Sequence, residues 1–236
     1  FCFIDKNVVI GDDNILMPHV NVLYGSRIGN GNHIHSGAVI GGIPQDLKFI
    51  GEDTTAEIGD NNHIRENVTI NRGTASKNKT VVGSNNLLME SLHIAHDCVI
   101  GNSCILGNST KLGGEVVVDD YATISAGVLI HQFCHIGGYV MIQGGSGVSQ
   151  DVPPFIMAGR NPLTYMGINI VRLRRENFAP ETIEIIHDVY RTIYKNGLNV
   201  SQAINTLKEN PTSENPEIKY IIDFISNSER GIIRVR

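Results

Sequence analysis

The chain has 236 residues, of which 41% are hydrophobic and 18% are charged, and it carries a formal net charge of −5 at pH 7. This composition is ordinary for a globular protein, and the negative charge excludes a broad attraction to nucleic acid or to anionic membranes. No apolar run approaches the ~20 residues that a membrane-spanning helix needs. The sequence has no signal-peptide pattern and begins at Phe1 in phase with the repeat described below, so we expect that earlier repeats have been trimmed or lost.

The residues from Ile4 to Val148 carry a hydrophobic repeat with a period of six. Of the 25 positions spaced six apart over this range, all but three are aliphatic. A helix has a period of 3.6 and a plain strand a period of 2, whereas a parallel β-helix built from hexapeptides has a period of six. Three hexapeptides make one triangular coil, so residues 18 apart should be stacked at a spacing of ~4.8 Å. The pattern predicts a columnar domain over residues 1–154.

The cysteines all occupy the position two residues before an aliphatic corner residue. They are Cys2, Cys98, Cys104 and Cys134. Side chains two apart in a strand point to the same face, so we expect all four to point into the column. No two of them are 18 residues apart, so none should stack directly on another. The pattern favours small buried residues in a reducing compartment over a disulfide or zinc framework.

Two segments leave the repeat without losing its phase, residues 43–56 and residues 72–79. Both are predicted to be loops that project from intact coils, and such loops often carry binding groups. The repeat ends at Asp151-Val152-Pro153-Pro154. Residues 155–236 are predicted to form a linker and a small α-helical domain that caps the column. Amphipathic patterns place helices at Glu181–Lys195, Asn199–Lys208 and Pro216–Ser226.

Histidines crowd into the middle coils, and the sharpest cluster is His93-Ile94-Ala95-His96-Asp97. A histidine followed by an aspartate offers a neutral base at pH 7 beside a carboxylate that can orient its ring. Gly114 lies 18 residues after His96 and is therefore expected directly above it. A glycine there leaves the backbone open, and its N–H could stabilise a developing oxyanion. The alternative is that the histidines only decorate polar faces of the column.

A catalytic zinc site is a rival interpretation, because some hexapeptide columns hold zinc with three convergent imidazoles. The spacing does not stack such a set. Lys111 lies 18 residues after His93, while His131 and His135 come 38 and 39 residues after His93 and His96. We therefore expect no metal.

Charged residues outside this cluster are less specific. Asp46 and Lys48, on the first loop, could be solvated surface charges, which is the usual fate of such residues. The arginines near the start of the C-terminal segment could bind phosphate. They are Arg172, Arg174 and Arg175.

Seven longer motifs follow one another along almost the whole chain. They are Ile43-Pro44-Gln45-Asp46-Leu47-Lys48, Ile64-Arg65-Glu66-Asn67-Val68-Thr69-Ile70, Asn86-Leu87-Leu88-Met89, His93-Ile94-Ala95-His96-Asp97-Cys98, His131-Gln132-Phe133-Cys134, Gln150-Asp151-Val152-Pro153-Pro154 and Arg230-Gly231-Ile232-Ile233-Arg234. In type and order they resemble the motifs of the bacterial UDP-N-acetylglucosamine O-acyltransferases, which begin lipid A synthesis. The resemblance is specific because it covers the whole chain, whereas the hexapeptide repeat alone is shared by many acyl- and acetyltransferases.

The resemblance implies a left-handed parallel β-helix with a C-terminal helical domain, assembled as a homotrimer with active sites between subunits. It implies transfer of an (R)-3-hydroxyacyl group from acyl carrier protein to the 3-hydroxyl of UDP-N-acetylglucosamine, in the cytoplasm. The implied chemistry uses no cofactor, no metal and no covalent acyl-enzyme. Neither nucleic acid nor a membrane span is implied.

The resemblance also assigns roles to individual residues. His96 matches the general base, Asp97 the group that orients it, and Gly114 the amide that stabilises the oxyanion. The residues that match substrate-binding positions are Gln45, Asp46, Lys48, His93, His131, Gln132, Asn169 and Arg175. Met89 and Gly144 match positions of the acyl-chain groove, where a glycine leaves room for a longer chain.

The chain departs from the family pattern at a few positions. Glu115 and Asn71 stand where the family usually has histidine. Glu176 stands where a second arginine is common, and Val171 replaces a common glutamate. Because these positions lie near the sugar and nucleotide, the same transfer to a UDP-sugar with a 3-amino group remains an alternative, as does a different hexapeptide-repeat acyltransferase.

Overall fold

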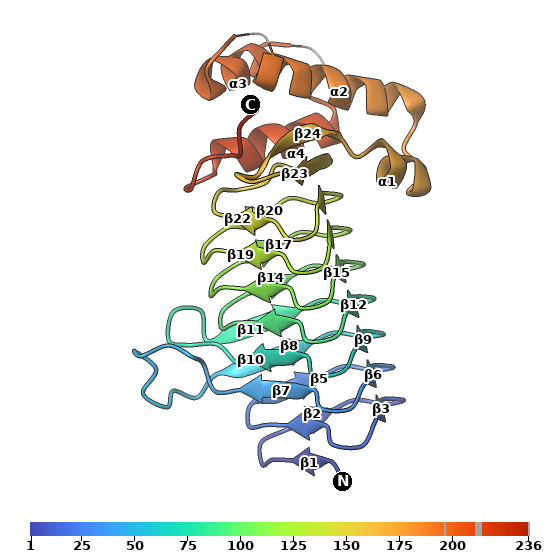
Figure 1. Cartoon of the computed structure of the whole chain (residues 1–236), viewed down its shortest axis with the longest axis vertical. Helices are drawn as coiled ribbons and strands as arrows, with labels where there is room; N and C mark the ends of the chain where they lie inside the picture. The colour runs from blue at the N-terminus through green and yellow to red at the C-terminus, as the bar shows by residue number, and fades with distance from the viewer. Residues whose placement is uncertain (196, 211–213, 236) are drawn as a thin grey trace.

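The computed structural model describes residues 1–195, 197–210 and 214–235. They form a tall column of short strands with helices gathered at its C-terminal end (Figure 1). The column is a left-handed parallel β-helix followed by helices, as predicted. Each complete coil contributes one strand to each of three sheets, which we call A, B and C in chain order. Every coil therefore has an A–B corner, a B–C corner and a C–A corner.

The strands of each sheet follow one another up the column. Sheet A contains β1 (Phe3–Ile4), β4 (Asn21–Val22), β7 (Val39–Gly42), β10 (Thr69–Asn71), β13 (His93–Ile94), β16 (Lys111–Leu112), β19 (Leu129–Ile130) and β22 (Gly147–Val148). Sheet B contains β2 (Val9–Ile10), β5 (Ser26–Ile28), β8 (Thr55–Ile58), β11 (Lys79–Val82), β14 (Val99–Ile100), β17 (Val117–Val118) and β20 (His135–Ile136). Sheet C contains β3 (Ile15–Leu16), β6 (His33–Ile34), β9 (His63–Ile64), β12 (Leu87–Leu88), β15 (Ile105–Leu106), β18 (Thr123–Ile124), β21 (Met141–Ile142), β23 (Ile156–Gly159) and β24 (Thr164–Ile168).

The aliphatic residues of the repeat fill the inside of the column. Ile40, Ile70 and Ile94 stack in sheet A and are fully buried. Burying one such side chain stabilises a protein by about 1.5–3 kcal/mol. Ile40 and Ile70 are 30 residues apart, and Ile70 and Ile94 are 24 apart, so these spacings exceed 18 by 12 and 6. Both excesses are multiples of six, which explains why the phase survives the two loops, one between β7 and β8 and one between β10 and β11.

A ladder of asparagines runs up the inside of sheet C, at the position two residues before each corner residue. The Asn62 side-chain oxygen accepts the Asn86 N–H at 2.9 Å, and the Asn62 amide donates to Asn32 Oδ1 at 3.0 Å and to the Gly83 carbonyl at 2.9 Å. Asn62 is fully buried, so these bonds have no competition from water. The ladder ends where Asn86 accepts the Cys104 N–H at 2.7 Å.

The cysteines take the inward position that the sequence predicts, since the Cys2, Cys98 and Cys104 thiols each donate to the backbone carbonyl 15 residues further on. The expected burial holds for three of the four and fails for Cys2. Cys98, Cys104 and Cys134 are buried, and burial raises the pKa of the Cys98 and Cys104 thiols to about 12 and that of Cys134 to about 11. Cys2 is exposed, because no described coil lies beneath the first one to cover it. All four are free thiols.

The residues after the column begin with a β-hairpin that the sequence pattern did not indicate. β23 adds to sheet C by pairing in parallel with β21, and β24 pairs antiparallel with β23. A short helix that was also not predicted, α1 (Ile170–Arg175), follows. The three predicted helices are present as α2 (Pro180–Lys195), α3 (Val200–Lys208) and α4 (Pro216–Ser226). None of the described helices is both long and apolar enough to cross a bilayer.

Helix α4 joins the helical segment to the top of the column. The Tyr220 hydroxyl donates to the Asp119 carboxylate and accepts the Gly138 N–H at 2.7 Å. Asp119 also binds His135 at 2.8 Å, and the His135 ring lies 4.4 Å from that of Phe224. These contacts cover the last coils, as predicted for a cap.

The ladder provides a test of what holds the coils together. We expect Asn62→Ala to lower the free energy of unfolding by roughly 3 kcal/mol, because the Asn86 N–H and the Gly83 carbonyl lose their buried partner. Asn108→Ala is the matched control, since Asn108 is exposed and should change stability by less than about 0.5 kcal/mol. Denaturant unfolding followed by circular dichroism measures both. Equal, small effects in the two variants would contradict a stabilising ladder.

Candidate active site

A cleft of about 700 Å³ runs along sheet A and the A–B corner of the upper coils. It collects six of the residues singled out from the sequence, namely Gln45, His93, His96, Gly114, His131 and Gln132. The apolar part of its wall consists of Leu112, Leu129 and Ile130. Pro162 and Leu163, between β23 and β24, line its upper end. Lys111 also lines the cleft, although the sequence did not mark it as a site residue.

The stacking of His96, Gly114 and Gln132 follows from the 18-residue repeat. The Glu115 N–H donates to the His96 carbonyl at 3.0 Å, and the Phe133 N–H donates to the Gly114 carbonyl at 3.1 Å. A Cβ atom on Gly114 would lie 2.6 Å from Cε1 and 2.7 Å from Nε2 of the His96 ring. Only glycine therefore leaves space for the imidazole. Within the described residues no acceptor takes the Gly114 N–H.

His96 is held by a buried carboxylate. Its Nδ1 lies 2.8 Å from Oδ2 of Asp97, whose side chain is fully buried. Asp97 has a φ of +61°, which turns its side chain back beside the preceding histidine. Because Nδ1 faces Asp97, the other ring nitrogen is left for a substrate.

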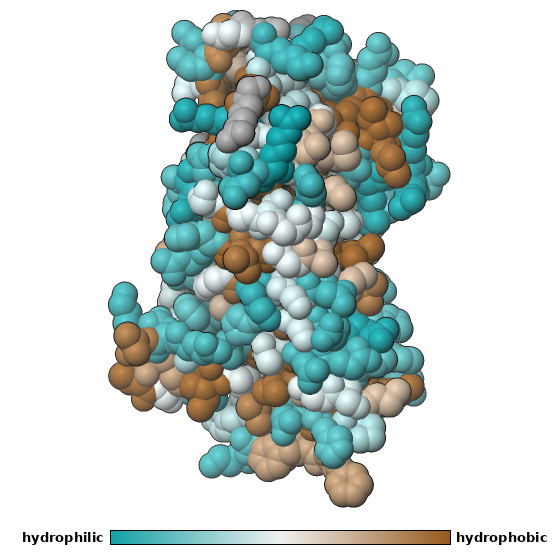
Figure 2. Space-filling model, viewed as in Figure 1, coloured by the Kyte–Doolittle hydropathy of each residue, from teal (hydrophilic) through white to brown (hydrophobic). Residues whose placement is uncertain are grey.

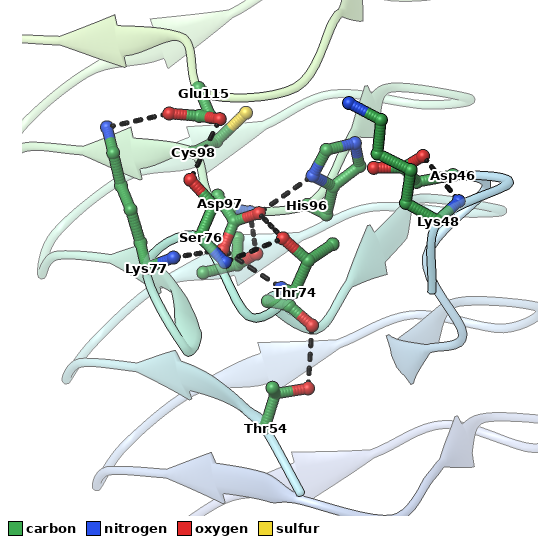
Figure 3. A network of polar contacts seen from close by, with 12 residues as sticks. Asp46, Lys48, Thr54, Thr74, Ser76, Lys77, His96, Asp97, Cys98 and Glu115 are labelled. Carbon is green, nitrogen blue, oxygen red and sulfur yellow. Dashed lines mark hydrogen bonds and ion pairs between the residues drawn. The ribbon is translucent and has the colours of Figure 1, made fainter. Parts of the chain in front are cut away.

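The loop between β10 and β11 supplies most of the partners of Asp97 (Figure 3). Oδ1 accepts the Thr74 N–H at 2.9 Å and the Lys77 N–H at 3.3 Å, while Oδ2 accepts the Thr74 hydroxyl at 2.6 Å. At the loop base, the Thr54 hydroxyl donates to the Gly73 carbonyl at 2.6 Å. Thr74 was missed by the sequence reasoning, because the period does not determine the path of an inserted loop.

His93 is the second histidine of the cleft. Its Nδ1 shares a hydrogen bond of 2.7 Å with the Thr69 hydroxyl on the coil below. Burial, with a smaller contribution from the positive charge of Lys111, lowers the pKa of His93 below its usual value. His93 is therefore neutral at pH 7 and offers a hydrogen bond without a charge.

The loop between β7 and β8 carries three of the expected binding residues. Gln45 reaches the cleft, whereas Asp46 and Lys48 do not line it. The Asp46 carboxylate accepts the Lys48 N–H at 2.9 Å and so shapes the loop itself. The loop also exposes large apolar side chains, with Leu47 and Ile50 at 105% and 90% exposure. Figure 2 shows brown, apolar atoms gathered where the loop projects from the column.

The remaining expected residues lie at other corners. Asn169 caps α1, accepts the Arg172 N–H and donates to the Tyr139 carbonyl at 2.9 Å, which places it at the B–C corner. Arg175 is exposed at the other end of this helix. Met89 and Gly144 lie at the C–A corner, with Gly144 three coils above Met89. The structure therefore does not bring these four residues into the cleft of the same chain.

Three departures from the family pattern make contacts within the chain. Glu115 does not line the cleft but accepts the Ser76 hydroxyl at 3.1 Å. Asn71 donates to the Ile43 carbonyl at 3.0 Å, at the start of the β7–β8 loop. Glu176 lies 3.3 Å from the Arg172 guanidinium. Among the described residues, no group of three or more histidine, cysteine, aspartate or glutamate side chains is placed to hold a metal ion.

The family models that match the chain describe both of its parts. Residues 151–233 match domain 2 of the UDP-N-acetylglucosamine O-acyltransferases, and residues 7–42 match the bacterial transferase hexapeptide repeat.

Solved structures extend this likeness over the whole chain. A UDP-N-acetylglucosamine acyltransferase from Bacteroides fragilis 9343 is 66% identical, with a TM-score of 0.96 over 99% of this chain and 91% of that chain. The enzyme from Francisella novicida is 41% identical, with a TM-score of 0.96 over 99% of this chain and 86% of that chain. The enzyme from Moraxella catarrhalis RH4 is 38% identical, with a TM-score of 0.95 over 99% of this chain and 91% of that chain. With this identity and coverage, the chain belongs to the UDP-N-acetylglucosamine acyltransferase family.

Proposed function

We propose that the protein transfers an (R)-3-hydroxyacyl group from the thioester of acyl carrier protein to the 3-hydroxyl of UDP-N-acetylglucosamine, as the first step of lipid A biosynthesis. The observation that carries this proposal is the His96–Asp97 pair facing a cleft beneath an unoccupied Gly114 amide. Membership of the acyltransferase family supplies the substrate class. The reaction is placed in the cytoplasm, where acyl carrier protein is found.

The arrangement suits direct transfer without a covalent enzyme intermediate. His96 takes the proton from the sugar 3-hydroxyl as the oxygen attacks the thioester carbonyl. Asp97, held by Thr74 and Lys77, keeps the ring oriented and stabilises the imidazolium that forms. The Gly114 N–H stabilises the oxyanion of the tetrahedral intermediate. When that intermediate collapses, the carbon–sulfur bond breaks and the carrier thiolate takes the proton from His96.

The rest of the cleft can bind the acceptor. His93 and Gln45 are close enough to the reacting corner to line the same cavity as His96, and neutral His93 fits a sugar hydroxyl. His131 and Gln132 lie one coil above Gly114 and are assigned to the nucleotide end. Asp46 and Lys48, on the loop that bears Gln45, are assigned to the sugar and to the acyl donor.

We infer that the active enzyme is a homotrimer with sites between subunits. Asn169 and Arg175 stand at a different corner of the column from His96, so they can complete a nucleotide site only on a neighbouring copy. Met89 and Gly144 lie at the third corner, where they can line an acyl groove between two columns. The exposed apolar tip of the β7–β8 loop fits burial against such a neighbour.

A 3-amino sugar nucleotide is the second candidate acceptor, because Asn71 alters the residue that the family usually has near the sugar. A direct comparison of the two acceptors with one acyl carrier protein thioester tests it. A higher kcat/KM for the 3-hydroxyl sugar supports the proposed function, and a strong preference for the amine would replace the acceptor while leaving the reaction class unchanged.

Removal of the imidazole tests the role of His96 as the base. We expect His96→Ala to lower kcat by about 10²-fold or more, because the hydroxyl then loses its proton without a positioned acceptor. His63→Ala is the matched control, since His63 is exposed on sheet C. Acyl transfer to UDP-N-acetylglucosamine, followed by mass spectrometry, measures both. Retention of full activity by the His96 variant would refute the assigned role.

A side chain at Gly114 tests whether the stacked geometry is needed. Gly114→Ala should lower kcat by at least about tenfold, because the new Cβ at 2.6 Å pushes the His96 ring away from its place. His63→Ala again serves as the control, since His63 is exposed on sheet C and does not line the cleft. The melting temperature should change little in either variant. A Gly114 variant with unchanged kcat would mean that the stacked geometry is not required.

Mixing two weakly active variants tests whether subunits share a site. Chains with His96→Ala and chains with Arg175→Ala should each be weak enzymes, whereas refolding them together should restore part of the activity. Mixed trimers contain some sites that combine an intact His96 from one chain with an intact Arg175 from another. The activity of the co-refolded mixture, compared with the sum of the separate preparations, measures the effect. No gain above that sum would place both residues in one chain's site.

A further inference from the structure

The β10–β11 loop holds Asp97, the partner of the base, yet the tip of the loop is exposed. Residues 75–79 are exposed, while Thr74 is buried against Asp97. Thr74 and Lys77 together give Asp97 three of its hydrogen bonds. The position of the Asp97 carboxylate, and with it the orientation of His96, therefore depends on where this exposed tip lies.

Glu115 contacts the loop from the coil above. Its Oε1 accepts the Ser76 hydroxyl at 3.1 Å, and its Oε2 lies 3.6 Å from the Lys77 ammonium (Figure 3). Glu115 is itself fixed, because its N–H donates to the His96 carbonyl at 3.0 Å. Its side chain is only 20% exposed, which shields these contacts in part from water.

The carboxylates of Asp97 and Glu115 therefore both bind the β10–β11 loop. Asp97 binds the loop backbone at Thr74 and Lys77, whereas Glu115 binds the side chains of Ser76 and Lys77. Lys77 takes part in both, through its N–H and through its ammonium group. The positive charge of Lys77 also offsets the repulsion between the two acidic side chains, which stand one coil apart.

We propose that Glu115 is a positioning residue for the acyl transfer, which with Ser76 and Lys77 clasps the β10–β11 loop and thereby holds Asp97 against His96. The inference rests on the proposed function for its kinetic part. Glu115 does not line the cleft, so it acts through the loop and not on the substrate. The residue that departs from the family pattern thus takes part in the chemistry indirectly.

Amide hydrogen exchange tests the clasp without reference to activity. In Glu115→Ala, the Thr74 and Lys77 amides should exchange at least about tenfold faster than in the wild type, because the loop opens more often. The amides of β13 should keep their rates. Alanine adds no backbone strain beyond that of Glu115, which already has a φ of +60°. Glu57→Gln is the control, since it removes the exposed pair with Lys79 and leaves Ser76 and Lys77 untouched.

Kinetics tests the positioning role. Glu115→Ala should lower kcat by about tenfold with the KM for UDP-N-acetylglucosamine nearly unchanged. Glu115→Gln should recover part of the loss, because it still accepts the Ser76 hydroxyl. In an Asp97→Asn background, Glu115→Ala should cost little more, since the group through which it acts is already impaired.

Several outcomes would overturn the proposal. Unchanged exchange at Thr74 and Lys77 would mean that Glu115 does not hold the loop. A rise in KM at constant kcat would mean that Glu115 binds substrate instead. If Glu115→Ala lowered kcat by the same factor in the Asp97→Asn background as in the wild type, Glu115 would not act through Asp97. If the wild-type protein transfers no acyl group, the proposed function fails, while the exchange experiment still decides whether the clasp exists.

Discussion

The stacking of coils through backbone hydrogen bonds is the constraint on which the rest of the structure depends. Alternate backbone N–H groups of the strands donate to the next coil, as the His93 N–H donates to the Thr110 carbonyl at 3.0 Å. This ladder keeps the register constant, so a residue has a defined neighbour above it and another below. Inside the column the constraint produces aliphatic stacks and the asparagine ladder. At the A–B corner it places His96, Gly114 and Gln132 in one line, and the cleft is built around that line.

The same constraint explains why the chemistry needs an inserted loop. In a regular coil most backbone N–H groups are already committed to the neighbouring coil, so few remain to solvate a buried carboxylate. Asp97 is fully buried, and without donors its charge would be costly. The β10–β11 loop adds six residues to one coil and brings the Thr74 and Lys77 amides, with the Thr74 hydroxyl, to that carboxylate. The inserted β10–β11 loop thus supplies the donors that allow a charged Asp97 carboxylate to be buried beside His96.

Sequence reasoning succeeded where the period decides the position. It predicted the β-helix, both projecting loops and the placement of Gly114 over His96, because these follow from counting residues. It failed where the position depends on an irregular path or on a missing neighbour. Thr74 lies on an insertion, the β23–β24 hairpin begins after the repeat has ended, and Cys2, expected to be buried, is exposed in the first described coil. The assignments of Asn169 and Arg175 came from family resemblance and stay predictions, because a single chain does not bring them to the cleft.

A rigid column also limits how such an enzyme can recognise its substrates. Strands of two residues stacked in constant register cannot close around a ligand, so they offer preorganised groups and little induced fit. Selectivity must then come from what is attached to the column, namely loops, the C-terminal cap and neighbouring copies. A residue of the column can therefore affect selectivity or catalysis by binding one of these attached parts, and Glu115 is an example. Glu115 is next to Gly114 in the chain, yet its side chain does not line the cleft and binds a loop instead. Proximity along the chain therefore does not decide whether a residue meets substrate, because at a β-helix corner consecutive side chains diverge.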